Sequence, residues 1–379
     1  YTALMFLDKA GNEQFEMVKV NDLAGWRESN RPLGSLRSTP KQSEGVETLR
    51  VLTAGTIPAA TATAAEWNFT VGKGAALFER LSQMPVKLGD IAHIFVGLQT
   101  SADTVFLFKD TPTLSNKLTK VYSKELDQEV SLESELLKPV VRSGEIGRYW
   151  ATPTAHVLFP YQVDDGKGKL IPEPEMKRVY PKTWEYLLKN KQLLANREHG
   201  KFKASGWYQL YPKNLDLWEQ PKILTPYMIT DLAAYPDKSD IYFVNVTTGG
   251  FGILIEESHG ALEYFTGLLN SHLLDWFLKQ VSTTFHGGYF AANKQFLVQL
   301  PIRPINFTDP ADKARHDKMV GLVESMLALH KHKAAAKTQA EQDLYQRQIE
   351  ATDRAIDGLV YELYGLTVEE IAVVEGRTG

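Results

Sequence analysis

A short polar segment between two apolar runs offers several hydrogen-bonding groups within five positions. The groups are an amide, two hydroxyls and a carboxylate, carried by Gln99, Thr100, Ser101 and Asp103. Gly97, which precedes them, permits a turn or a close backbone approach. Such groups suit hydrogen bonding to the edge of a polymer. The alternative interpretation is an ordinary hairpin loop, and this segment alone does not decide between the two.

Three further groups combine donors, cations or aromatics with flexible backbone. A basic loop that contains Gly144 and Gly147 carries Arg142, Ser143 and Arg148. Another stretch interleaves cations with aromatic residues, namely Lys201, Lys203, Trp207 and Tyr208. The third group consists of His286, Gly287, Gly288, Tyr289, Asn293 and Lys294. Each group has a structural alternative, because Trp207 and Tyr289 could be core aromatics and any one arginine could be a surface ion-pair partner.

The elements that must position these groups are short strands and a few helices. Strand composition at Ile91–Val96 and Val105–Phe108 predicts a hairpin that presents the polar loop, and two more strands are expected at Ile223–Tyr227 and Ile241–Val246. Apolar residues at helical spacing predict helices over Lys182–Arg197 and His259–Lys279, with the second stripe in the core. Gly249, Gly250 and Gly252 suggest a turn between strands rather than a dinucleotide fingerprint. We therefore expect an α+β fold with a mixed sheet.

The C-terminal part changes to two long helices. From Asp309 a broad apolar face includes Val323 and Met326, and a heptad frame follows from Tyr345 to Leu363. These faces predict a C-terminal antiparallel helical pair. Whether Lys331–Lys337 extends a helix or forms the bend stays open. Gly365 can end the second helix, and Thr367–Glu370 has capping-box spacing for a short third helix.

The domain organisation follows from these patterns. Residues 1–84 are predicted to be the end of an upstream domain plus a connector, with a strand at Thr2–Leu7 and a helix over Glu66–Met84. Residues 85–306 form the second domain and residues 307–379 the helical segment. Because the chain starts at Tyr1 inside an expected strand, we take it to be part of a longer polypeptide.

Composition limits the class of protein. The 379 residues contain 43% hydrophobic residues and no cysteine, which indicates a globular protein without disulfides, and we expect it to be cytoplasmic with no membrane partner. The net charge of −4 argues against a strongly basic nucleic-acid binder. However, residues 136–230 hold 15 Lys and Arg against 9 Asp and Glu, whereas residues 311–379 hold 9 against 12. This distribution suggests one basic face and an acidic end, or simply an uneven solvated surface.

Several segments in a fixed order resemble one family. The resemblance is carried by LGDIAHIFVGLQTSADTVFLF from Leu88, ELLKPVVRSGEIGRYW from Glu135, VLFPY from Val157, TWEYLLKNKQLLANRE from Thr183, QPKILTPYM from Gln220, LLNSHLLDWFL from Leu268, FHGGYFAANKQFLVQLPI from Phe285, and the stretch from Ile356 to Ile371. Together they resemble the TaqI-like C-terminal specificity domain of type IIG restriction–modification enzymes. One departure is Pro212-Lys213, where related sequences tend to have an arginine, so a phosphate contact there is in doubt.

The resemblance implies a double-stranded DNA partner and an upstream adenine-N6 DNA methyltransferase domain that uses S-adenosylmethionine. The polar loop would then read bases, and the basic groups would hold phosphates. The flipped-base loop of such methyltransferases contains a Pro-Pro pair, and this sequence has none. We therefore expect no catalytic, cofactor-binding or metal-binding residues in this chain. His330 and His332, two positions apart, point to different sides of a helix and do not suit zinc.

Other functional interpretations stay open. The chain could be the specificity subunit of a type I system, although only one recognition domain is visible. It could be an assembly module that does not read DNA, or a hydrolase whose carboxylates the spacing does not reveal. The sequence also leaves open whether the parent enzyme carries a nuclease.

Overall fold

The computed structural model describes residues 13–20, 52–58, 74–109, 117–164, 167–203, 206–211, 213–238, 241–245 and 249–377. The chain divides into two compact units, one made of residues 1–84 and 366–379 and the other of residues 85–365. The strand expected at Thr2–Leu7 lies outside the described residues, and so does the first part of the helix expected over Glu66–Met84.

The first unit combines a strand pair with short helices. Strands β1 (Gln14–Val20) and β2 (Leu52–Pro58) pair antiparallel along their full length. Helices α3 (Ala75–Ser82) and α14 (Val368–Val374) are joined by an ion pair between Arg80 and Glu370, with 2.8 Å between Nη2 and Oε2. A segment from the C-terminal end of the chain therefore belongs to the N-terminal unit.

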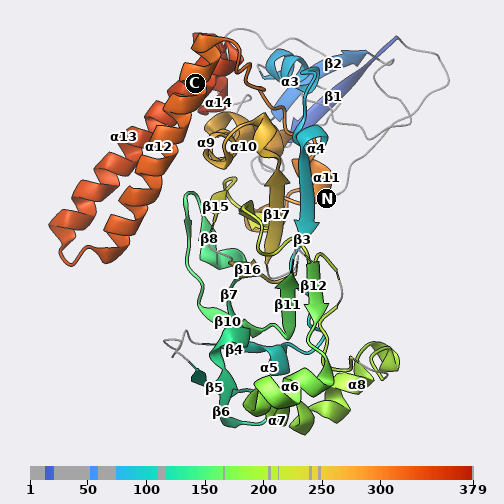
Figure 1. The fold of residues 1–379 in the computed structure, drawn as a ribbon. Helices are drawn as coiled ribbons and strands as arrows, with labels where there is room; N and C mark the ends of the chain where they lie inside the picture. Colours follow the sequence, from blue (N-terminus) through green and yellow to red (C-terminus); the bar gives the residue numbers. More distant parts are fainter. Residues whose placement is uncertain are drawn as a thin grey trace. The chain divides into compact units, whose positions relative to one another are not determined.

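Two four-stranded sheets form the frame of the second unit (Figure 1). The first, in the order β15-β13-β17-β3, is antiparallel and contains β3 (Ala92–Val96), β13 (Lys222–Pro226), β15 (Tyr235–Asp237) and β17 (Gly250–Ile255). The second, in the order β16-β7-β10-β4, contains β4 (Leu107–Lys109), β7 (Leu137–Val141), β10 (Ala155–Leu158) and β16 (Tyr242–Phe243). Its β16–β7 pair is parallel and its other pairs are antiparallel. The expected α+β fold with a mixed sheet is confirmed.

The hairpin expected around the polar loop is wrong. Strand β3 pairs with β17, whereas β4 belongs to the other sheet and pairs with β10. Val105 and Phe106 are not in a strand, because the short helix α5 (Asp103–Phe106) precedes β4. The polar segment thus crosses from one sheet to the other.

The glycines expected to form a turn are also placed differently. Gly250 and Gly252 lie within β17, where a Cβ atom would collide with the Thr225 carbonyl and with the Phe95 ring respectively. Their role is to let neighbouring groups approach the strand closely.

Short strand pairs surround the two sheets. They are β5 (Leu118–Ser123) with β6 (Gln128–Glu133), β8 (Ile146–Gly147) with β9 (Trp150–Ala151), β11 (Tyr161–Asp164) with β12 (Lys167–Leu170), and β14 (Met228–Ile229) with β18 (Phe290–Ala291).

Both long helices expected before residue 300 are divided in two. The first becomes α7 (Pro181–Lys189) and α8 (Lys191–Gly200), and the second becomes α9 (Leu262–Leu269) and α10 (His272–Val281). Ser271 caps α10, because its hydroxyl accepts a hydrogen bond from the Leu274 amide. The other helices are α4 (Leu88–Ile91), α6 (Glu173–Val179), α11 (Lys294–Leu297) and the 3₁₀ turns η3 (Ser134–Leu136), η4 (Ser143–Glu145) and η5 (Glu257–His259).

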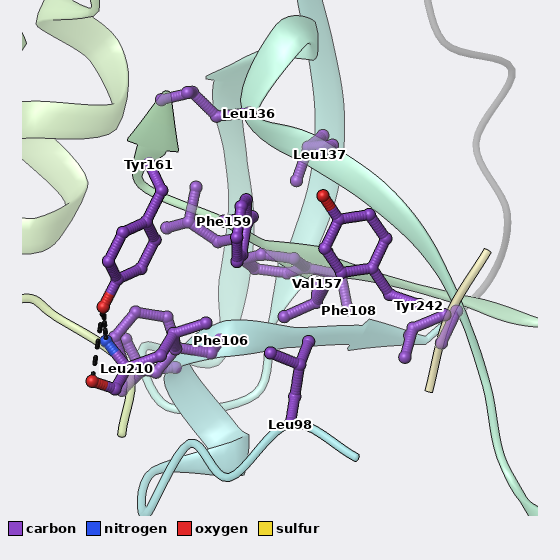
Figure 2. Packing of buried hydrophobic residues seen from close by; sticks show 14 of the residues in the cluster. Leu98, Phe106, Phe108, Leu136, Leu137, Val157, Phe159, Tyr161, Leu210 and Tyr242 are labelled. Atoms are coloured by element: carbon purple, nitrogen blue, oxygen red, sulfur yellow. Dashed lines mark hydrogen bonds between the residues drawn. The ribbon is translucent and has the colours of Figure 1, made fainter. Parts of the chain in front are cut away.

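A large apolar cluster fills the space around the second sheet. Figure 2 shows Phe106, Phe108, Val157 and Phe159 pointing toward one another from neighbouring elements. At its edge the Tyr161 hydroxyl accepts a hydrogen bond from the backbone amide of Leu210 at 2.8 Å between N and Oη. The cluster therefore fixes the base of the segment that follows Gly97.

The C-terminal helical pair is present as expected. Helices α12 (Pro310–Ala335) and α13 (Gln339–Tyr364) run side by side, and Figure 1 shows their connecting turn at the end away from the sheets. Hydrogen bonds from Arg315 to Glu362 near one end and from Lys333 to Gln346 near the other fix their antiparallel register. Gly365 ends α13 in the left-handed conformation, with φ of 61°.

Candidate nucleic-acid interface

The polar segment after β3 is held in place by backbone contacts on both sides. The Leu98 amide donates to the Phe243 carbonyl at 2.8 Å, and the Leu98 carbonyl accepts from the Asn245 amide at 2.9 Å. At Gly97 a Cβ atom would collide with the backbone of Val244, so only glycine permits this approach. The segment is thereby anchored before its polar side chains begin.

The four polar residues of the segment have different roles. Thr100 is buried, and its hydroxyl donates to the Asp103 carboxylate and accepts from the Ala102 amide. The Ser101 hydroxyl donates to Glu198 at 2.7 Å. The half-buried Gln99 has a side-chain amide without a hydrogen-bond partner among the described residues. The free amide of Gln99 and the exposed carboxylate of Asp103 are therefore the groups best placed to meet a ligand.

A buried arginine connects this segment to two others. The Arg197 side chain is only 5% exposed, and its guanidinium donates to four backbone carbonyls. The acceptors are Thr100 at 2.6 Å, Gln209 at 2.7 Å, and Trp207 and Leu194 at 2.9 Å each. The guanidinium also lies over the Phe202 ring, with 4.4 Å to the centroid. Burial lowers the pKa of Arg197 to about 10, because desolvation disfavours the charged form of the guanidinium.

Strained backbone gathers at the same place. Ser101, Glu198, His199 and Asn214 all have positive φ, between 49° and 58°, which residues other than glycine adopt rarely. The Ser101–Glu198 hydrogen bond joins two of them, and the Asn214 side chain donates to the Val96 carbonyl at 3.3 Å. Strain of this kind persists only where the surroundings enforce it, and it concentrates at functional sites. We call residues 97–103, 197–203, 209–211 and 213–214 the loop cluster.

Cations border the loop cluster. The Lys201 ammonium donates to the Tyr211 hydroxyl at 3.0 Å, and the Lys213 ammonium lies 5.3 Å from the centroid of the same ring. The hydrogen bond from Lys201 lowers the pKa of Tyr211. Lys203 is exposed in the same loop. The backbone amide of Tyr211 donates to the Gln99 carbonyl at 3.0 Å, so these cations lie beside the polar segment.

The two aromatics proposed beside these lysines belong to the core. Trp207 and Tyr208 are 4% and 2% exposed, and both pack against Trp184. For Trp207 the structure thus agrees with the alternative interpretation as a core aromatic.

The arginines of the basic loop predicted to hold phosphates have partners within the protein. Arg148 makes a two-pronged ion pair with Asp353 of α13, at 2.6 and 2.9 Å, and donates to the Asn270 carbonyl at 2.6 Å. Arg142 donates to Thr154 and pairs with Glu145. In this conformation both guanidinium groups have partners within the protein, and a role in DNA contact stays a prediction.

The last predicted group, the residues from His286 to Lys294, lies partly on the surface. His286, Tyr289 and Lys294 are exposed, whereas the Asn293 side chain caps α11 by accepting from the Phe296 amide. Tyr289 lines a cleft of about 450 Å³ together with Ser143 and Arg148. The cleft therefore brings residues of two predicted groups together.

Sequence reasoning assigned no functional role to several residues that shape these sites. Arg197 ends a stretch that reads as an ordinary amphipathic helix, and its partners are spread over more than 100 positions. Tyr211 lacks any local motif, and Trp150 is only the last residue of the family-like segment from Glu135. Lys213 stands out in the sequence only as a departure from the family pattern.

Among the described residues, no group of three or more His, Cys, Asp or Glu side chains is arranged to hold a metal ion. In the same residues no helix has the length and apolar character needed to cross a membrane.

Comparison with known proteins confirms the resemblance stated above. Residues 180–302 match the model of the TaqI-like C-terminal specificity domain. The matched range contains Arg197, Lys201, Lys203 and the segment from His286 to Lys294, but neither the polar loop at Gln99 nor the helical pair.

A curated relative extends the similarity over nearly the whole chain. It is the type II restriction enzyme and methyltransferase RM.Eco57I of Escherichia coli, which is 23% identical over 389 residues. The alignment covers 97% of this chain and 36% of the relative, so the chain spans about a third of the relative's length.

Proposed function

We propose that this chain is the DNA target recognition part of a restriction–modification enzyme. In this proposal it directs an adenine-N6 DNA methyltransferase domain that lies upstream in the parent polypeptide and uses S-adenosylmethionine. The match to a specificity domain and the similarity to a restriction enzyme and methyltransferase support the proposal. They also favour a type II enzyme over a separate type I specificity subunit.

The observation that carries the proposal is the joining of two loops by Arg197. One loop presents Gln99 and Asp103, and the other, within the family-matched segment, presents Lys201 and Lys203. A side-chain amide can bond both edge atoms of adenine in the major groove, whereas lysines neutralise phosphates. The loop cluster thus combines a group suited to reading a base with groups suited to positioning the duplex.

The chemistry of these residues indicates which step this chain would perform in the parent enzyme. Base-edge contacts specify the sequence and phosphate contacts fix the register of the duplex. A preorganised loop binds its ligand more tightly than a mobile one, because less conformational entropy is lost on binding. In our proposal this chain binds DNA and positions it, while the methyl transfer takes place in another domain.

Binding-site selection tests the proposal. The chain is incubated with a pool of random duplexes, bound DNA is recovered and sequenced, and the affinity of the enriched sequence is measured by fluorescence anisotropy at several salt concentrations. We expect one motif to be enriched and the affinity to fall with salt. A recovered pool that stays random, or no binding at low salt, would contradict the proposal.

A further inference from the structure

The cleft that contains Tyr289 is built by elements far apart in sequence. The β8–β9 hairpin contributes Trp150, the turn after β14 contributes Thr230, helix α12 contributes His330 and helix α13 contributes Asp353. Its volume of about 450 Å³ falls within the range of small-ligand pockets. The helical pair and short strands of the second unit thus line one open cleft.

Large apolar side chains are exposed around this cleft. Trp150 is 37% exposed, Met228 39% and Tyr289 42%, and all three line it. Exposed aromatics that gather at a concave site indicate a ligand with an apolar face. A planar aromatic ring fits this lining better than an aliphatic chain, since aromatic residues with polar tips supply both stacking and hydrogen bonding.

The polar groups of the cleft are mostly neutral or already neutralised. Arg148 and Asp353 compensate each other in their ion pair, and Asp231 shares the Lys279 ammonium with Asp275, at 3.0 and 2.7 Å respectively. Burial lowers the pKa of His330 to about 4, so its imidazole is uncharged near neutral pH. An anionic ligand would find no unpaired cation among the residues that line the cleft, whereas an uncharged ring needs none.

Backbone strain marks the same site. Tyr149, next to Trp150, has φ of 65°, a conformation that is a clear outlier for a bulky residue. Its side chain is buried and lines the cleft, with Arg148 above its ring. The strained turn places Trp150 over Gly147, where a Cβ atom would collide with the indole. The hairpin is therefore shaped to present this indole.

We propose that the cleft binds a nucleobase that has left the base stack of bound DNA, stacked against Trp150 and Tyr289. This inference rests on the proposed function. Nucleobases are uncharged planar rings with hydrogen-bonding edges, and proteins hold unstacked bases between aromatic side chains and polar groups. The base is distinct from the adenine that is methylated, because the cleft contains no Asn/Asp-Pro-Pro-Tyr/Phe loop.

Abasic scanning tests the inference. Duplexes of the selected sequence, each lacking one base at a different position, are titrated with the wild-type chain, with Trp150→Ala and with Tyr289→Ala. We expect each substitution to weaken binding to the intact duplex about tenfold. At a single position, removal of the base should weaken wild-type binding by a similar factor and make the substitutions nearly silent.

Two controls make the result specific. Tyr122→Ala removes an aromatic side chain that is 50% exposed on β5. The effect of this substitution on affinity should be the same whichever base is missing from the duplex. Trp150→Phe keeps an aromatic face and should restore most of the affinity. A second arm titrates the chain without DNA with free nucleosides and follows tryptophan fluorescence, which distinguishes a base carried by DNA from a free one.

The outcomes separate the two proposals. The inference is supported if Trp150→Ala weakens binding to the intact duplex but has almost no effect when the base at one particular position is missing. Intact DNA binding without positional coupling overturns the inference and leaves the proposed function standing, even if free nucleosides quench the fluorescence. Absence of DNA binding by the wild-type chain overturns the proposed function and the inference with it.

Discussion

The Arg197 guanidinium donates a hydrogen bond to the carbonyl oxygen of Thr100, with 2.6 Å between Nη1 and O. The two residues are 97 positions apart, and Thr100 is a buried residue inside the polar segment. Because the same guanidinium also donates to the Trp207 and Gln209 carbonyls, and to that of Leu194 in its own helix, one side chain joins three backbone segments. The conformation of the loop cluster therefore depends on a residue that does not face solvent.

The first prediction concerns this arginine. Arg197→Met should lower the free energy of unfolding by about 2–4 kcal/mol, because a buried carbonyl left without a donor costs about 1–3 kcal/mol. Arg197→Lys should recover only part of the loss, since an ammonium has three donors and lacks the planar fork. Urea unfolding measures the stability of both variants.

Arg178→Met, at an exposed position on α6, is the matched control and should change stability by less than about 0.5 kcal/mol. Equal effects at both arginines would refute the role of Arg197.

A second prediction concerns the attachment of the helical pair. Arg148 and Asp353 are 29% and 19% exposed, so water screens their ion pair only in part. A double-mutant cycle with Arg148→Ala and Asp353→Ala should give a coupling of about 1–2 kcal/mol in unfolding free energy. The Lys313–Asp317 pair on α12, with both side chains more than half exposed, is the control and should give less than about 0.5 kcal/mol. Additive effects at Arg148 and Asp353 would mean that the ion pair does not stabilise the docked helix.

The helical pair and its caps could be predicted because their signals are local. Gly365 ends α13, and the Thr367 hydroxyl accepts from the Glu370 amide at the start of α14, as the sequence indicated. The hairpin around Gln99 could not be predicted correctly. Strand composition gives no information on the pairing partner, and β3 pairs with β17, which begins at Gly250.

The candidate site could be predicted only in part, because only some of its features are local in sequence. Polar residue types identified the segment from Gln99 to Asp103, but Arg197 resembles any helical arginine until its four carbonyl partners are known. Trp207 next to lysines looked like a stacking platform, whereas tertiary packing buries it against Trp184. Local patterns therefore found the polar loop, and only long-range contacts revealed what holds it.

The third prediction concerns pH. The His272 imidazole of α10 is hydrogen-bonded to Asp357 of α13 at 2.5 Å, and this bond raises the pKa of His272. A histidine with a raised folded-state pKa contributes its full stabilisation below the unfolded value of about 6.5 and loses it as pH rises through the folded value. The contribution of His272 to the free energy of unfolding should therefore decrease as the pH rises above about 6.5.

The pH effect can be isolated with two variants. His272→Gln should flatten this part of the pH profile in urea unfolding, because the titrating group is gone. His259→Gln, an exposed histidine in η5, should leave the slope as in the wild type. An unchanged slope in His272→Gln would show that another group causes the pH dependence.

The last prediction separates reading from positioning within the loop cluster. Gln99→Ala removes an amide that has no partner among the described residues, so the fold should be unaffected. If the amide reads a base, the variant should lose about 1–3 kcal/mol of discrimination between matched and mismatched duplexes, with the salt dependence unchanged.

Lys203→Ala and Lys213→Ala should instead weaken binding to all duplexes alike, and each should reduce the log–log salt slope by about 0.9 if it neutralises one phosphate. Anisotropy titrations of matched and single-mismatch duplexes at several salt concentrations measure both quantities. Equal losses on all duplexes for Gln99→Ala would assign Gln99 to positioning, and no loss at all would leave the segment as a structural connection between the two sheets.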